Sequence, residues 1–339
     1  MDTWTAARLS DCAFNFFIGG RGIGKTYSAL KGHKEAFNRG EANKIMYMRL
    51  SQVELDLCAT DSDNPYKKLN AREHWGVKFE SVPKSKAYDI VDEVSEETIG
   101  TARALATFGN VRGSDFFDVS HIYVDEFNPT EKVRKSPELK NAGYLFAQAY
   151  ETINRNRELE GEPPVKVIFT ANAFTLDSNI LYYYGLIPLI QQMQKSGQKK
   201  ATLRDRSIYV ELCEAADIAE AKQETVLYKA LNGNKKLINT NIKNQFNDYN
   251  LTLVKKVQLI EYIPVVQYED ICIYQHKSTG EYYAARRFEQ CGNVYTEKER
   301  GLFTRLWKST LTAAIWERTI FADNVNTLYE LKQIIETPL

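Results

Sequence analysis

A glycine-rich run near the start of the chain has the residue types that bind phosphate. Residues 19–26 read GGRGIGKT and match the pattern G-x-x-x-x-G-K-[ST]. Glycines let the backbone curl until several N–H groups point at phosphate oxygens, and the next helix adds its positive end. Lys25 is suited to reach the β- and γ-phosphates, and the Thr26 hydroxyl is suited to bind Mg²⁺. We therefore expect ATP to be bound by Gly19, Gly20, Arg21, Gly22, Ile23, Gly24, Lys25 and Thr26.

A pair of acidic residues follows another strand-like run. Residues 120–127 read SHIYVDEF, so a strand would deliver Asp125 and Glu126 to its C-terminal end, where ligands bind in parallel sheets. Asp125 would hold Mg²⁺ through water, and Glu126 would polarise the attacking water. Taken alone, such a pair is more often an ordinary pair of loop acids. Together with the glycine-rich run it predicts ATP hydrolysis, with Lys25 and Glu126 as catalytic residues.

Four further residues are candidates for contact with the nucleotide. Arg155, with Arg157 in reserve, ends a helix-like segment and could serve as an arginine finger for a neighbouring subunit. The alternative is a solvated arginine that favours the helix dipole. Asn172 follows a strand and could sense the γ-phosphate, or belong to a turn that caps the strand. Arg49 ends the second strand and is either a sensor of the same kind or a surface charge.

The surrounding pattern indicates an α/β fold in two parts. Apolar runs predict strands at residues 14–18, 45–49, 122–124 and 165–169, with helices at 25–37 and 142–155 between them. This alternation predicts a mostly parallel, helix-covered sheet. A helix at 214–231 and an Asn- and Lys-rich stretch at 232–250 would then lead to strands at 260–266, 271–274 and 282–286 and helices at 302–316 and 325–335. We expect an ATPase domain at 1–213, a helical linker at 214–247 and a small domain at 248–339.

The bulk composition constrains the class of protein. The 339 residues include 44 Lys plus Arg and 44 Asp plus Glu, so any nucleic-acid contact must come from local basic clusters. The five cysteines have neither CxxC nor zinc-ligand spacing, which favours free thiols in a reducing cytoplasm. We find no signal peptide and no apolar stretch long enough to span a bilayer, and expect a soluble, intracellular protein without a membrane partner.

These motifs together resemble one family. The run FNFFIGGRGIGKTYSALK, the YMR of the second strand, IYVDEF, and ETINRNRE followed by a strand and TAN are similar to the genome-packaging ATPases of phi29-like short-tailed phages, relatives of the terminase large subunits. The resemblance covers nearly the whole chain. It implies a P-loop NTPase domain of the additional-strand glutamate class and an RNase H-like second domain. By motif, Arg155 matches a trans-acting finger and Arg49 a strand-end arginine.

The same resemblance implies a function and its partners. It implies a homo-oligomeric ring, a pentamer in that family, which uses ATP and Mg²⁺ to drive double-stranded viral DNA into a procapsid. The portal, or connector, and a structural packaging RNA would be partners. The ring would work in the host cytoplasm, attached transiently to the procapsid, and would be absent from the mature virion.

The second domain departs from the larger terminases. Cleavage by two metal ions needs converging carboxylates, and Glu261, Glu269 and Asp270 lack the expected spacing. We therefore expect a nuclease fold without nuclease activity. The alternatives are a terminase-type ATPase that also cuts DNA, and a P-loop ATPase that is not a motor.

Two basic clusters are candidates for DNA contact. Such runs are more often solvated surface, but a motor that grips any sequence needs phosphate contacts of this kind. The first cluster follows the acidic pair, and the second lies near residue 200. The candidates are Lys132, Arg134 and Lys135 in the first cluster and Lys195, Lys199, Lys200 and Arg204 in the second.

Overall fold

The structure is a computed structural model. It describes residues 2–109, 116–128, 139, 141–172, 176, 178–214, 225–226, 230, 253–287 and 289–336. The chain divides into two units, residues 1–247 and 248–339, and each is described by itself. Within the described ranges, every helix is too short or too polar to cross a membrane.

A nine-stranded mixed sheet forms the centre of the first unit. Its strand order is β3-β4-β5-β2-β6-β7-β1-β9-β8. The six strands from β5 to β9 in this order pair in parallel, whereas β3 and β4 at one edge and β8 at the other pair antiparallel. The strands are β1 (Phe14–Gly19), β2 (Lys44–Arg49), β3 (Val77–Ser81), β4 (Ala87–Asp92), β5 (Glu97–Ala104), β6 (Val119–Asp125), β7 (Lys166–Asn172), β8 (Lys200–Leu203) and β9 (Ile208–Cys213).

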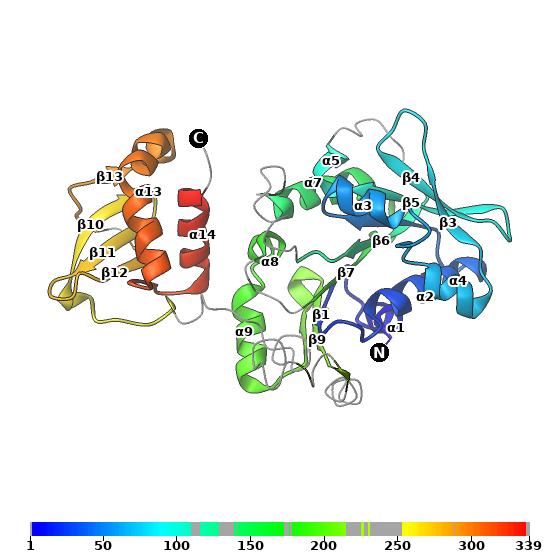
Figure 1. The fold of residues 1–339 in the computed structure, drawn as a ribbon, viewed down its shortest axis with the longest axis horizontal. Helices are drawn as coiled ribbons and strands as arrows, with labels where there is room; N and C mark the ends of the chain where they lie inside the picture. The colour runs from blue at the N-terminus through cyan, green and yellow to red at the C-terminus, as the bar shows by residue number, and fades with distance from the viewer. Residues whose placement is uncertain are drawn as a thin grey trace. The chain divides into compact units, whose positions relative to one another are not determined.

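Helices cover both faces of this sheet. The β1-to-β2 crossover runs across the sheet opposite to the β6-to-β7 crossover, and since parallel crossovers are right-handed, α2 and α7 lie on opposite faces. Figure 1 shows α1 and α2 together on one side and α7 and α8 on the other. The helices are α1 (Thr3–Leu9), α2 (Lys25–Asn38), α3 (Gln52–Cys58), α4 (Lys67–Glu73), α5 (Leu105–Phe108), α7 (Ala142–Asn154), η2 (Arg157–Glu160), α8 (Asn179–Tyr183), α9 (Ile187–Ser196) and η3 (Arg204–Arg206).

Alternate residues of the central strands form a different core on each face. On the α2 face, Phe17, Tyr47, Tyr123 and Ile168 belong to one buried cluster with Leu30 of α2. The α7 face is aromatic, because Phe16 stacks on Phe169 with centroids 4.3 Å apart and Phe146 of α7 packs edge-on to Phe169 at 4.8 Å. The two cores hold the central strands between the helix layers. Because these strands are parallel, their carboxyl ends lie together along one edge of the sheet.

The second unit is a smaller α/β sandwich. Its five-stranded sheet has the order β13-β10-β11-β12-β14, in which β10, β11 and β12 form an antiparallel meander. Phe303 and Leu311 of α13, with Leu328 and Leu331 of α14, pack on the sheet. The elements are η5 (Leu259–Glu261), β10 (Tyr262–Tyr268), β11 (Ile271–His276), β12 (Tyr282–Arg286), β13 (Val294–Tyr295), η6 (Glu297–Glu299), α13 (Arg300–Glu317), β14 (Ile320–Ala322) and α14 (Val325–Glu336).

Most of the elements expected from the sequence are confirmed, with two differences. Residues 170–172, placed after the fourth strand, are the end of β7, so the turn interpretation of Asn172 is wrong. Seven strands were not predicted, namely β3, β4, β5, β8, β9, β13 and β14. The predicted helix at 214–231 and the linker at 232–250 lie outside the described residues, apart from positions 214, 225–226 and 230.

Candidate nucleotide-binding site

The glycine-rich run forms the turn between β1 and α2. Gly22 has φ +77° and Gly24, the N-cap of α2, has φ +88°, a left-handed conformation that glycine adopts without strain. The N–H groups of the first turn of α2 have no acceptor within the helix, and such groups can bind an anion. Gly19 is required for a different reason, because a Cβ at this position would lie 2.3 Å from the carbonyl oxygen of Cys213 in β9.

Lys25 points back into this loop. Its Nζ donates to the carbonyl oxygens of Gly19 at 3.0 Å and Gly20 at 2.9 Å, and lies 3.4 Å from Oδ1 of Asn172. The side chain is buried, with 7% exposed. The ammonium group is thus held inside the loop, where a phosphate could replace neutral carbonyl acceptors with a charged one.

Asp125, at the end of β6, is the centre of a dense polar cluster. Its carboxylate is buried, and donors from α2, β2, β6 and β7 surround it. The Oδ1 atom of Asp125 lies within hydrogen-bonding distance of Thr26 Oγ1 (3.1 Å), Tyr123 OH (2.9 Å) and Thr170 Oγ1 (3.0 Å). Its Oδ2 atom accepts hydrogen bonds from Tyr47 OH (2.9 Å) and Arg49 Nη1 (3.2 Å). Thr26 and Asp125, the two residues expected to bind Mg²⁺, are therefore in direct contact.

Glu126 is linked to the loop through Asn172. The Nδ2 of Asn172 donates to both carboxylate oxygens, at 2.7 and 2.9 Å, while its Oδ1 faces Lys25. Glu126 has a left-handed backbone, φ +55°, which turns it away from the β6 direction. Burial, and then the charge of Asp125, raise the pKa of Glu126 above its ordinary value. A carboxylate of this kind is a stronger base than a solvated glutamate.

The candidate arginines fall in three different environments. Arg49 belongs to the cluster, with its guanidinium between Asp125 and Glu54, 3.6 Å from the latter. Arg155 is exposed directly after α7 and has the unusual backbone angles φ +44° and ψ −129°. Arg157 is buried, donates to the carbonyl of Phe117 and lies over the Phe117 ring. Packing against Phe117 thus accounts for Arg157, which leaves Arg155 as the stronger candidate finger.

Sequence reasoning missed the three hydroxyl groups beside Asp125. Tyr47, Tyr123 and Thr170 are apolar-strand residues that any buried sheet could contain. One signal was available, since Tyr123 stands two residues before Asp125 and side chains two apart share a face of a strand. Tyr47 and Thr170 become visible only through the strand order and register.

The basic residues near position 200 are not equivalent. Lys199 pairs with Glu214 and Lys200 lies 3.8 Å from Glu211. Lys195 and Arg204 are exposed, and in the described parts of the chain no carboxylate forms an ion pair with either one. Two of the four predicted contacts therefore have a protein partner. The other cluster, Lys132, Arg134 and Lys135, lies outside the described residues.

Comparison with known proteins decides the family. The model of the podovirus DNA encapsidation protein (Gp16) family matches residues 7–302. The chain belongs to this family. Its members encapsidate viral DNA, so the resemblance found in the sequence is confirmed. No curated protein matches the sequence.

Solved structures show that the encapsidation protein shares its fold with packaging motors. The Phi-28 gp11 DNA packaging motor aligns with a TM-score of 0.68 at 15% identity, covering 99% of this chain and 98% of the other. The bacteriophage Phi-29 genome packaging motor assembly aligns with a TM-score of 0.60 at 17% identity, covering 98% of both chains. Both likenesses extend through the two units.

Proposed function

We propose that this DNA encapsidation protein is an ATP-driven motor subunit. It would convert ATP and water to ADP and phosphate at the ends of β1, β6 and β7 and use the energy to move double-stranded DNA. The observation that carries the proposal is the meeting of the two sequence motifs, with Thr26 Oγ1 3.1 Å from Asp125 and Asn172 between Lys25 and Glu126. The relatives that are packaging motors support the same function.

The residues present suit a magnesium nucleotide. Loop N–H groups and Lys25 would bind the phosphates, and the Thr26 hydroxyl with the Asp125 carboxylate supplies the oxygen donors that Mg²⁺ prefers. Bound Mg²⁺ would neutralise charge on the phosphate oxygens. Asp125 would orient the Thr26 hydroxyl, and Glu126 would accept a proton from the attacking water. Asn172 would hold the Glu126 carboxylate at a fixed position relative to the phosphate-binding loop.

The strand order supports the additional-strand glutamate class of P-loop NTPase. One extra strand, β7, lies between β1, which carries the loop, and β6, which carries the acidic pair. In this class the glutamate beside the acidic strand end activates water. The proposed class thus agrees with the placement of Glu126 at the end of β6.

The second unit supports an RNase H-like fold without nuclease activity. Its meander with the parallel neighbour β13 beside β10 fits the proposed fold. The candidate carboxylates face protein partners, because Asp270 pairs with Arg286, Glu269 accepts from the Glu297 amide and Glu261 lies 3.5 Å from His276.

Assembly is part of the proposal. A ring at the portal of a procapsid, with DNA in its channel, would let Arg155 of one subunit reach the γ-phosphate of its neighbour. The exposed position of Arg155 and its costly backbone, of order 1–3 kcal/mol, support this role. A pentamer, a structural packaging RNA and transient attachment in the host cytoplasm remain proposals that rest on the family resemblance.

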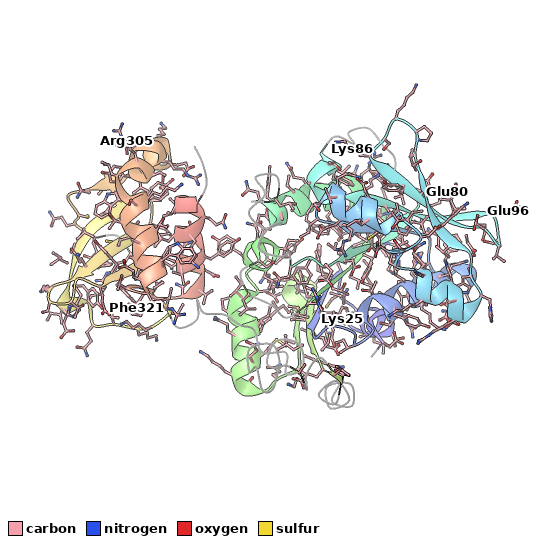
Figure 2. The ribbon with its side chains drawn as sticks, in the orientation of Figure 1. Lys25, Glu80, Lys86, Glu96, Arg305 and Phe321 are labelled. Carbon is pink, nitrogen blue, oxygen red and sulfur yellow. The ribbon has the colours of Figure 1, made fainter. Side chains whose placement is uncertain are left out.

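Separate measurements of ATP binding and hydrolysis test the proposed function. Lys25→Ala should lose both, and Glu126→Gln should bind Mg·ATP but hydrolyse it about 10²-fold or more slowly, because the base is lost. Lys86→Ala and Glu96→Gln are matched controls, since both residues are exposed and lie at the periphery of the first unit, away from Lys25 (Figure 2). Wild-type turnover by Glu126→Gln would contradict the assignment.

A further inference from the structure

Tyr47 is a fully buried phenol beside the acidic pair. Its side chain has 0% exposure, and its hydroxyl donates to Oδ2 of Asp125 at 2.9 Å. The other polar neighbour is Cys58, whose sulfur lies 3.6 Å away. A phenol has one proton, and a carboxylate is a far stronger acceptor than a thiol. The proton of Tyr47 is therefore committed to Asp125.

The strand register explains why this phenol reaches the carboxylate. β2 and β6 pair in parallel with Tyr47 opposite Tyr123, and the ring centroids are 5.7 Å apart. Tyr123 and Asp125 share a face of β6, and Thr170 of β7 is the register partner of Asp125. Three hydroxyls from neighbouring strands thus converge on one carboxylate, on the face that α2 covers.

The geometry points to Tyr47 as a positioning residue for ATP hydrolysis, an inference that rests on the proposed function. Tyr47 and Arg49 hold Oδ2, which leaves Oδ1 directed at the Thr26 hydroxyl. Through this contact Tyr47 fixes the orientation of the two groups that would bind Mg²⁺. It touches neither nucleotide nor water in this role and acts only through Asp125.

Loss of the phenol proton donor would loosen this arrangement. In its absence the only protein donor on Oδ2 among the described contacts is Arg49, at the longer distance of 3.2 Å. Groups that orient metal ligands from behind typically contribute about 10–100-fold to metal affinity or activity.

Tyr47→Phe in the full-length protein tests the inference, because it removes one oxygen and keeps the ring. We expect the Mg²⁺ concentration for half-maximal ATPase to rise by about tenfold. The Mg²⁺ dependence of binding of a fluorescent ATP analogue should shift in the same direction, which gives a readout without turnover. The affinity for the analogue at saturating Mg²⁺ should change far less. Tyr123→Phe, which removes a second hydroxyl from the same carboxylate, is the second variant.

Tyr66→Phe is the matched control. Tyr66 is also fully buried and its ring lies near Phe79, as that of Tyr47 does, but its hydroxyl has no hydrogen-bond partner among the described residues. It should leave the Mg²⁺ dependence unchanged. The inference is overturned if Tyr47→Phe lowers the melting temperature but matches Tyr66→Phe in both Mg²⁺ readouts. Failure of the proposed function itself looks different, since the wild type would then show no ATP hydrolysis, or Lys25→Ala would bind and hydrolyse ATP as the wild type does.

Discussion

Asn172 connects the two halves of the site at the scale of single residues. Its amide oxygen faces the ammonium of Lys25 and its amide nitrogen faces the carboxylate of Glu126, which is the orientation that the two charges require. A phosphate that draws Lys25 toward itself would therefore change one side of this bridge. The acid that would activate water is thus coupled to the group that would bind the nucleotide.

This bridge predicts a pH effect. Glu126 must be ionised to accept a proton, so the rate should fall as pH falls through its raised pKa. The amide protons of Asn172 favour the ionised form, and their removal should raise the pKa of Glu126 further. In a pH–rate profile, Asn172→Leu should therefore move the acid limb to higher pH.

The alkaline limb of the same profile is an internal control for the Asn172→Leu variant. It should stay in place, because Glu126 is already ionised there. An acid limb at the wild-type position would show that Asn172 does not act on the ionisation of Glu126.

At the scale of elements, basic side chains lie on the edge strand β8 and on its neighbours in the chain, α9 and η3. Lys199 and Lys200 lie beside Glu214 and Glu211, which offset their charge. Lys195 and Arg204 have no such partner among the described residues and are the better candidates for contact with DNA phosphates. An electrostatic contact of this kind is independent of base sequence and sensitive to salt.

This difference predicts how DNA binding depends on salt. For Lys195→Ala combined with Arg204→Ala, the slope of log K against log salt should become shallower by about 0.9 for each lost phosphate contact on duplex DNA. The matched control is Lys199→Ala with Lys200→Ala, for which the change should be smaller. Equal slopes for the two double variants would count against the assignment.

The elements that carry the site could be predicted, and the edge of the sheet could not. Continuous apolar runs make β1, β2, β6 and β7 recognisable, because these strands are buried on both faces. The strands β3, β4 and β5 are only partly buried, with half-buried or exposed residues between the buried ones, and the turns that join them contain Lys84 and Glu96, both with positive φ. Their pairing depends on a long-range neighbour, β2, which local pattern does not reveal.

The site shows the same division. Short sequence motifs were enough to predict four of the site residues, namely Lys25, Thr26, Asp125 and Glu126. Tyr47 was not, since its role depends on β2 lying beside β6 in one particular register. A sequence reports which groups a site needs, whereas the strand order decides which buried polar groups support them.

At the scale of the whole molecule, the proposed function places one ATPase site in the first unit of every subunit of a ring. The family establishes DNA encapsidation, and the geometry brings together the glycine-rich loop, two candidate Mg²⁺ ligands and a candidate base within one chain. Arg155 lies exposed at the end of α7, where a neighbouring subunit could receive it. The central claim is that each site hydrolyses ATP with an arginine from the next subunit.

The most direct test is the ATPase activity of mixed assemblies of Glu126→Gln and Arg155→Ala, each expected to be inactive alone. On random mixing at equal amounts, about a quarter of the interfaces would pair an intact Arg155 with an intact Glu126. We expect activity to return toward that fraction, whereas the Arg305→Ala variant, which changes an exposed arginine of the second unit, should stay fully active by itself. No recovery at any mixing ratio, with assembly confirmed by light scattering, would contradict the central claim.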